Sequence, residues 1–296
     1  MLSYVLCPLH PANIIYLPRF AQIPGQKLLE NLKQKRGMTM SNTVLAELKD
    51  GILLLTLNRP EKKNSFNTEQ WKAFAAELDA ARKDDDVNVV VITGAGNDFS
   101  AGQDLKDTMV PGALHSYRIL ERAVIDFDKP LVAAAKGVAV GGGATILFHS
   151  DVLYVGESLR MRMPFNSLGM APEFASSYML QALIGTQRAA ELLFTTEWIN
   201  ADKALETGIA SRKFKDDELL QNAMAKAAEI AQWPLSSLRE TKRCLKMAHK
   251  AGIDAAIMAE HEAMDKLAGG PASMEAMMAF MEKRKPDFRK LKKKPL

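Results

Sequence analysis

The chain has 296 residues, of which 47% are hydrophobic and 25% charged, the proportions of a soluble globular protein. No apolar run in the sequence is long enough to span a membrane, and Cys7 and Cys244 are too few and too distant for a disulfide framework. This cysteine usage predicts a reducing, cytoplasmic location. The five histidines show no metal-ligand spacing, so the sequence disfavours a metal enzyme.

The net charge of +4 comes from the two ends of the chain. Residues 1–37 carry five Lys or Arg against one Glu, and residues 283–296 carry eight against one Asp, which leaves an acidic body. Because the basic residues are not spread over the fold, we expect neither nucleic acid nor a membrane as a partner.

Regular structure is predicted to begin near residue 43. Residues 1–40 are rich in proline and lack periodicity, so we expect a disordered or irregular extension outside the fold. The apolar runs 43–49 and 52–58 flank Asp50–Gly51, a dipeptide typical of a tight β-hairpin.

A helix and a buried strand follow the hairpin. Asn67, with Gln70 three residues later, resembles a capping box and predicts a helix that runs to about Asp84. Residues 87–94 form a short, β-branched and fully apolar run, the pattern of a parallel strand that is buried on both faces. A further helix is predicted around residues 113–126.

The second half begins with strands and continues with helices. Residues 130–140 are predicted to form one buried strand that leads into three glycines and a short helix, and two more strands follow at 151–156 and 159–165. Strands that alternate with helices predict an α/β fold with crossover connections. After Pro172 the periodicity predicts helices over 173–184, 186–195, 201–208, 216–232, 234–249, 254–268 and 273–285.

Two loops are candidates for a functional site. Ala101–Asp104 and Gly141–Gly143 each follow a buried strand, and α/β sheets bind ligands at that edge. Glycines let the backbone approach a ligand closely, although the same triplet also suits a tight turn where a helix packs on a sheet. Neither loop fits a dinucleotide fingerprint or a Walker motif. The chemistry that remains is two backbone amides that converge on one oxygen atom.

Several segments resemble the signature blocks of the crotonase, or enoyl-CoA hydratase/isomerase, superfamily. They are NRPEKKNSFN (58–67), FSAGQDL (99–105), GVAVGGGATI (137–146), MPFNSLGMAPEFASSY (163–178), TQRAAELLFT with NADKALETGIA (186–210) and AFMEKRKPDF (279–288). The resemblance implies an α/β spiral of ββα turns over 41–235 and a helical trimerisation region over 236–296 with a basic tail. It also implies assembly as a homotrimer or hexamer, an acyl-CoA substrate, and no cofactor apart from the coenzyme A of that substrate.

The resemblance also assigns roles to residues. It implies that the amides of Gln103 and Gly142 form the oxyanion hole for the thioester carbonyl. For Lys62 and Lys63 the resemblance implies contacts with the phosphates of coenzyme A, although a solvated surface pair explains them equally well. The path of the substrate is implied to be lined by Ala101, Asp104, Leu105, Gly141 and Phe165.

The reaction is indicated by a departure from the family pattern. Hydratases of the superfamily use two glutamates, and the matching positions here hold Thr145 and Phe165, which cannot activate water and protonate carbon. Glu173 matches the single catalytic glutamate of the Δ3,Δ2-enoyl-CoA isomerase branch. Without the resemblance, Glu173 after Pro172 would be interpreted as an acid that opens a helix, and Asp104 is a weaker candidate base.

We therefore expect an enzyme that isomerises 3-enoyl-CoA to 2-enoyl-CoA with one base and an oxyanion-stabilised dienolate. Two alternatives stay open at this point. One is an enoyl-CoA hydratase or another crotonase-type acyl-CoA enzyme that pairs Glu173 with a different group. The other is a non-catalytic acyl-CoA-binding scaffold whose basic tail contacts nucleic acid.

Overall fold

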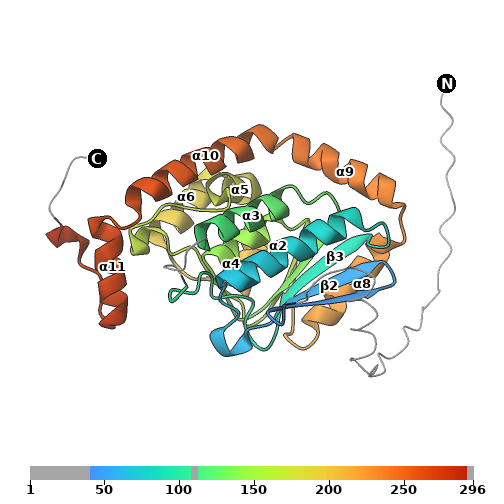
Figure 1. Cartoon of the computed structure of the whole chain (residues 1–296), viewed down its shortest axis with the longest axis horizontal. Helices are drawn as coiled ribbons and strands as arrows, with labels where there is room; N and C mark the ends of the chain where they lie inside the picture. The colour runs from blue at the N-terminus through green and yellow to red at the C-terminus, as the bar shows by residue number, and fades with distance from the viewer. Residues whose placement is uncertain (1–40, 108–112, 292–296) are drawn as a thin grey trace. The chain divides into compact units, whose positions relative to one another are not determined.

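The computed structural model describes residues 41–107 and 113–291 (Figure 1). The predicted irregular extension 1–40 and the end of the basic tail, 292–296, lie outside the described residues. None of the helices in the described part of the chain has the length and apolar character needed to cross a membrane.

A six-stranded sheet carries the fold, and all its neighbouring strands run parallel except the first pair. The first two strands form the predicted hairpin, in which Asp50 and Gly51 both adopt positive φ, as its two-residue turn requires. The order is β1 (Val44–Lys49), β2 (Ile52–Leu57), β3 (Val89–Gly94), β4 (Leu131–Ala135), β6 (Val152–Gly156) and β9 (Arg212–Phe214).

Helices cover both faces of this sheet (Figure 1). Val90 and Ile92 of β3 point to the main core, which includes α2 (Thr68–Lys83) and α3 (Ala113–Ile125). Their neighbours in the same strand, Val89 and Val91, pack against α8 (Leu219–Ala231) on the opposite face. The prediction of a strand that is buried on both faces is confirmed, because each face of the sheet meets a helix layer.

The predicted single strand 130–140 is wrong, because the chain turns out of the main sheet at Gly137. Gly137 has φ +58, and a Cβ there would overlap the carbonyl oxygen of Asn97. After this turn a smaller, three-stranded sheet begins. Its central strand pairs with one parallel and one antiparallel strand. This sheet consists of β5 (Val138–Val140), β7 (Arg160–Arg162) and β8 (Ile199–Asn200), and β5 leads into α4 (Gly142–Thr145) and the 3-10 turn η2 (Ile146–His149).

The chain after Pro172 is mostly helical, as predicted, with boundaries that differ by a few residues. Two short strands, β8 and β9, were not predicted, because two or three residues are too few to show a period. The first predicted helix also starts too early, since Glu173 lies before it. The helices are α5 (Ser176–Ile184), α6 (Thr186–Thr195), α7 (Ala201–Thr207), α8, α9 (Leu235–Met247), α10 (Lys250–Leu267) and α11 (Pro271–Met281), with 3-10 turns η1 (Pro60–Lys62), η3 (Asn166–Leu168) and η4 (Phe288–Lys290).

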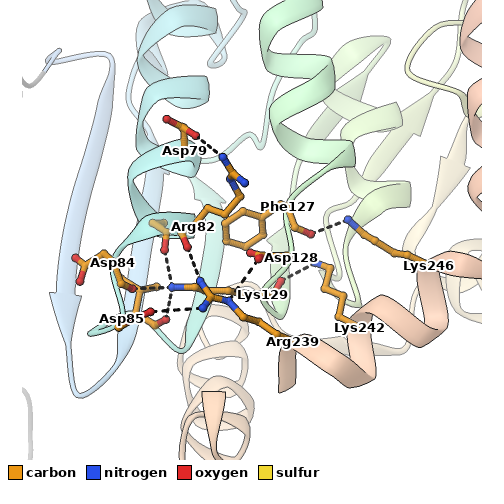
Figure 2. Close-up of polar contacts among 12 residues, drawn as sticks. Asp79, Arg82, Asp84, Asp85, Phe127, Asp128, Lys129, Arg239, Lys242 and Lys246 are labelled. Carbon is orange, nitrogen blue, oxygen red and sulfur yellow. Dashed lines mark hydrogen bonds and ion pairs between the residues drawn. The ribbon is translucent and has the colours of Figure 1, made fainter. Parts of the chain in front are cut away.

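Cations rather than apolar side chains fix α9 to the body (Figure 2). Arg239 donates to the carbonyl of Arg82 at 2.5 Å, and Lys246 donates to the carbonyls of Ile125 and Phe127 at 2.5 and 2.6 Å. Between them Lys242, which is 3% exposed, donates to the Lys129 carbonyl and the Asp151 carboxylate. The three side chains recur on one helix face, so the register of α9 is set by hydrogen bonds to carbonyl groups.

Lys242→Met should destabilise the protein by about 2–3 kcal/mol, because it leaves a buried carbonyl and a carboxylate without their cation. Urea denaturation followed by circular dichroism measures the loss. Arg243→Met is the matched control, since Arg243 is exposed and, among residues 41–107 and 113–291, forms an ion pair only with its helix neighbour Glu240. An equal loss of stability in the two variants would contradict the role of Lys242 in docking α9.

Large apolar side chains lie exposed on the last helix. Phe280 is 65% exposed and Met281 68%, and three other methionines of α11 are also exposed, namely Met274, Met277 and Met278. An apolar surface of this kind indicates contact with another protein surface.

We expect the chain to form a trimer or hexamer in solution through this surface, as the sequence predicts. Multi-angle light scattering at micromolar concentration should give a mass of three or six chains. Replacing Phe280 and Met281 together by serine should lower the mass, whereas replacing the exposed Glu282 should not. A wild-type monomer would count against the prediction.

Candidate active site

Main-chain pairing brings together the two loops singled out in the sequence. Ser100 and Ala139 form a parallel bridge, in which the Ser100 amide donates to Val138 and the Val140 amide donates to Ser100, both at 3.0 Å. Phe66 forms a similar bridge to Gln103 on the other side of the segment. The strand-like loop is therefore held on both sides, and it ends beside the glycines that follow β5.

The approach of the two loops leaves no room for side chains. Gly102 has φ +83, and a Cβ on it would overlap the Val140 carbonyl and lie 3.6 Å from the amide nitrogen of Gly142. Gln103 is the residue after Gly102, and Gly142 lies two residues after Val140, so both amides belong to the segments that meet here. Within the described residues, neither amide donates to a main-chain acceptor of the protein. The arrangement thus keeps two donors available at one place, which is what stabilisation of a carbonyl oxygen requires.

The carboxyl group of Glu173 lies at the same place. Its Oε1 is 3.3 Å from the position that a Cβ on Gly142 would take and 3.8 Å from the corresponding position on Gly141. The Cη2 atom of Trp71 lies 3.2 Å from the same point on Gly142. The structure therefore brings three predicted site residues, Glu173, Gly142 and Gly141, into one cluster and adds Trp71 to it.

Four aromatic rings form a continuous wall next to this cluster. Phe66 stacks on Trp71 at 4.0 Å between ring centroids, and Trp71 and Tyr117 meet edge to face at 5.6 Å, as do Tyr117 and Phe174. All four side chains are buried, and the Trp71 indole also donates to the side-chain oxygen of Gln103 at 3.0 Å. The wall excludes water from one side of the site and fixes the Gln103 loop.

This surrounding changes the acidity of Glu173. Glu173 as a whole is half-buried, and its carboxyl is the enclosed end of the side chain. Burial, together with the nearby carboxylates of Glu260 and Glu121, raises the pKa of Glu173 from 4.5 to about 8. A carboxyl group with such a pKa beside unengaged amide donors is suited to proton transfer.

Glu173 does not open a helix, which corrects the expectation from Pro172. The next two residues, Phe174 and Ala175, have φ +61 and +52, so they form a left-handed turn, and α5 begins only at Ser176. The sequence shows no signal for this turn, because neither residue is a glycine or an asparagine. An acid placed only to complement a helix dipole would not need such a turn.

The residues predicted to contact coenzyme A lie along the same loop. Lys62 and Lys63 are both exposed at the end of η1, and the carbonyl of Lys63 accepts the amide of Ala101 at 2.9 Å. Lys63 is also 3.9 Å from the carboxylate of Asp98. Leu105 is exposed on the outer side of the loop. Their role in binding coenzyme A stays a prediction.

The other predicted side chains differ in what they can do. Asp104 pairs with Arg59 at 3.0 Å and accepts the Lys106 amide at 3.1 Å, so its carboxylate is engaged in holding the loop. Phe165 is buried, and Thr145 is fully buried with a hydroxyl that finds no partner among the described residues. Neither of these two positions supplies an acid.

The residues that sequence reasoning missed are Trp71, Tyr117, Glu121 and Glu260. Trp71 lies one helical turn after the capping residue Asn67, a position that sequence patterns assign only to the core. The carboxylates are found only through tertiary contacts. Within the described part of the chain, no group of His, Cys, Asp or Glu is arranged to hold a metal ion.

Comparisons with known proteins show the family of the chain. Residues 47–292 match the family model described as enoyl-CoA hydratase/isomerase. The chain is 32% identical to the 1,2-epoxyphenylacetyl-CoA isomerase of Escherichia coli (84% of this chain, 99% of the relative) and 32% identical to its 2,3-dehydroadipyl-CoA hydratase (80% and 95%). It is 31% identical to human enoyl-CoA delta isomerase 2, covering 74% of this chain and 58% of the relative.

A solved structure is similar over the same part of the chain. The enoyl-CoA hydratase/isomerase from Pseudoalteromonas atlantica superimposes with a TM-score of 0.81 at 33% identity, over 83% of this chain and 99% of that one. The predicted α/β crotonase fold is therefore confirmed, and the chain belongs to the enoyl-CoA hydratase/isomerase family.

Proposed function

We propose that this protein isomerises 3-enoyl-CoA thioesters to 2-enoyl-CoA thioesters with Glu173 as its only catalytic base. The observation that carries the proposal is the position of the Glu173 carboxyl. It lies next to Gly142, whose amide, like that of Gln103, donates to no main-chain acceptor among the described residues. The residues at the two positions where hydratases of this family carry acids, Thr145 and Phe165, cannot accept a proton from water at neutral pH.

The proposed reaction moves one proton and one double bond. The thioester oxygen accepts hydrogen bonds from the amides of Gln103 and Gly142, and the Glu173 carboxylate removes a proton from C2. The electron pair of that C–H bond forms a C2=C1 bond, which gives a dienolate whose charge rests on the thioester oxygen. The C3=C4 pair then takes the proton from Glu173 at C4, and the double bond moves to C2=C3. Each amide contributes about 3–4 kcal/mol to stabilising the dienolate.

The acidity of Glu173 suits both halves of this cycle. A base with a pKa of about 8 is a much stronger proton acceptor than an ordinary glutamate, yet its conjugate acid still returns the proton readily. The cost is that roughly one molecule in ten carries the ionised base at pH 7. A single group that both accepts and donates the proton needs this compromise.

The relatives support an acyl-CoA substrate. The choice between isomerisation and hydration has to be argued from the residues of the site. The three relatives described above are two isomerases and a hydratase by name. Hydration needs a second acid beside Glu173, and the candidate carboxyl groups are engaged elsewhere. Asp104 pairs with Arg59, Glu121 binds Tyr117 and His261, and Glu260 accepts two backbone amides. A non-catalytic scaffold has no need for an enclosed carboxyl of raised pKa, which is unfavourable for stability. Both observations favour the isomerase.

We expect the pure protein to convert trans-3-hexenoyl-CoA to the 2-enoyl product and to hydrate crotonyl-CoA far more slowly. Glu173→Gln should lower the isomerisation rate by about 10²–10⁴-fold, because it removes the base but keeps the shape. Binding of an acyl-CoA, measured by calorimetry, should stay near wild type. Thr145→Ala and Phe165→Leu are the matched controls, and neither should approach the loss caused by Glu173→Gln. Wild-type isomerisation by folded Glu173→Gln would overturn the assignment.

The same variant makes a second prediction, on stability. The pKa of Glu173 is raised in the folded protein to about 8 from 4.5, so folding is increasingly opposed as pH rises between these values and the side chain ionises only in the unfolded state. Glu173→Gln removes this effect. The variant should therefore be about 1–3 kcal/mol more stable than wild type at pH 8.5 and equally stable near pH 4.5. Urea titrations at both pH values test this, and a variant that is less stable at pH 8.5 would contradict the enclosed position of the carboxyl.

A further inference from the structure

The turn that presents Glu173 is an unfavourable piece of backbone. Phe174 and Ala175 are consecutive residues with side chains, and both adopt the left-handed conformation, which is rare for such residues. Backbone of this kind persists only where surrounding groups hold it. The groups that hold this turn therefore decide where the carboxyl of Glu173 lies.

One of these groups comes from α10. The carboxylate of Glu260 accepts the amide of Ala175 at 2.7 Å and the amide of Ser177 at 2.8 Å, one on each oxygen. These amides lie at the start of α5, where no acceptor within the helix is available to them. Glu260 is only 3% exposed, and within the described residues it forms no ion pair with a cation. A buried carboxylate with two amide donors and no cation is thus committed to this turn.

The second group is His149 of η2. Its Nε2 lies 2.7 Å from the carbonyl oxygen of Phe174, and since a carbonyl only accepts, Nε2 carries the hydrogen. Burial lowers the pKa of His149 to about 4, so the ring is neutral at physiological pH. His149 thus fixes the carbonyl side of the turn, and Glu260 fixes its amide side.

We propose that Glu260 is a positioning residue for Glu173: its carboxyl group accepts the amides of the left-handed turn and thereby fixes where the carboxyl of Glu173 lies. The inference rests on the proposed function only in naming Glu173 as the base. It assigns to α10, a helix of the C-terminal region, a direct part in building the site. The contact spans 85 positions of the sequence between Ala175 and Glu260.

The charges around Glu173 show why the charge of Glu260 matters as well as its hydrogen bonds. From α3, Glu121 faces the same space, where it accepts the hydroxyl of Tyr117 at 3.0 Å and pairs with His261 of α10 at 2.8 Å. After burial, the charge of Glu260 is the largest contribution to the raised pKa of Glu173, followed by that of Glu121. Removing the charge of Glu260 should therefore make Glu173 a weaker base.

Two substitutions separate the hydrogen bonds from the charge. Glu260→Gln removes the charge and replaces one of the two acceptors by an NH₂ group. Glu260→Asp keeps the charge but withdraws the carboxylate by one methylene. Glu262→Gln is the matched control, because Glu262 lies on the same helix with a side chain that is 70% exposed. In the described part of the chain, Glu262 forms an ion pair only with Lys266.

The kinetic readout is the pH profile of isomerisation. Both Glu260 variants should lower kcat by about 10- to 100-fold with little change in KM, because a displaced base reacts poorly with a substrate that still binds. In Glu260→Gln the midpoint of the rise in kcat/KM with pH should also move to lower pH by several tenths of a unit. In Glu260→Asp and Glu262→Gln it should stay near the wild-type value. A purely structural role would lower the rate without moving the midpoint.

Two readouts do not depend on the reaction. Carboxyl ¹³C NMR of labelled glutamate, with the Glu173 signal identified by its absence in Glu173→Gln, follows the titration of Glu173 directly. Hydrogen exchange measures protection of the Ala175 and Ser177 amides in wild type and in each folded variant. If the wild type does not isomerise 3-enoyl-CoA, the proposed function fails, while these two measurements still test Glu260.

We expect protected amides in the wild type, exposed amides in both Glu260 variants, and a lowered titration midpoint of Glu173 in Glu260→Gln. The proposal is overturned if folded Glu260→Gln keeps the wild-type rate and midpoint. It is also overturned if the two amides exchange freely in the wild type, a result that needs no variant to fold.

Discussion

The main-chain contact between the segment 99–104 and β5 is the constraint on which the site depends. Gly102 lies directly against the carbonyl of Val140, so no side chain separates the two loops, and the Gly142 amide nitrogen lies close to Gly102. Two neighbouring residues hold this contact in position. Phe66 forms a β-bridge with Gln103, and the indole of Trp71 donates a hydrogen bond to the Gln103 side chain. Because the donors belong to the backbone, their placement is a property of the fold rather than of any one side chain.

The proposed role of Glu173 as a base sets stability against reactivity. Burial and the charges of Glu260 and Glu121 raise the pKa of Glu173 and so oppose its ionisation, and the left-handed turn after it adds further unfavourable energy. The structure meets this conflict with groups that act on the turn rather than on the carboxyl itself. His149 binds the carbonyl of Phe174 and Glu260 accepts the amides of Ala175 and Ser177, so both groups act on the turn that follows Glu173.

Local patterns predicted the parts of the fold that are determined locally. The hairpin at Asp50–Gly51 and the cap at Asn67, whose side chain accepts the Gln70 amide, depend on residues within a few positions of each other. The other half of the expected capping box is absent, since the Gln70 side chain donates to the carbonyl of Thr43 in the hairpin. At Gln70 a tertiary hydrogen bond has replaced a local one, and no sequence pattern predicts this replacement.

The same distinction explains what was missed in the site. The two glycine loops and Glu173 carry their signal in the sequence, as rare residue types at strand ends and as positions that match a family block. The left-handed turn has no such signal, because it is held from outside by His149 and Glu260. Likewise the break of the strand at Gly137 depends on Asn97, which lies forty positions earlier in the chain.

The docking of α9 connects these points to the C-terminal part of the chain. Lys242 and Lys246 bind carbonyl groups of the segment that precedes β4, which fixes α9 and, through it, the start of α10 (Figures 1 and 2). Since α10 carries Glu260 to the turn after Glu173, the placement of the proposed base depends on a helix for which the family resemblance implied only a role in assembly. Cations suit this role, because a hydrogen bond to a carbonyl fixes position along a helix more sharply than apolar contact does. The boundary predicted near residue 235 stays a prediction, and the contact of Glu260 with the amides of Ala175 and Ser177 extends across it.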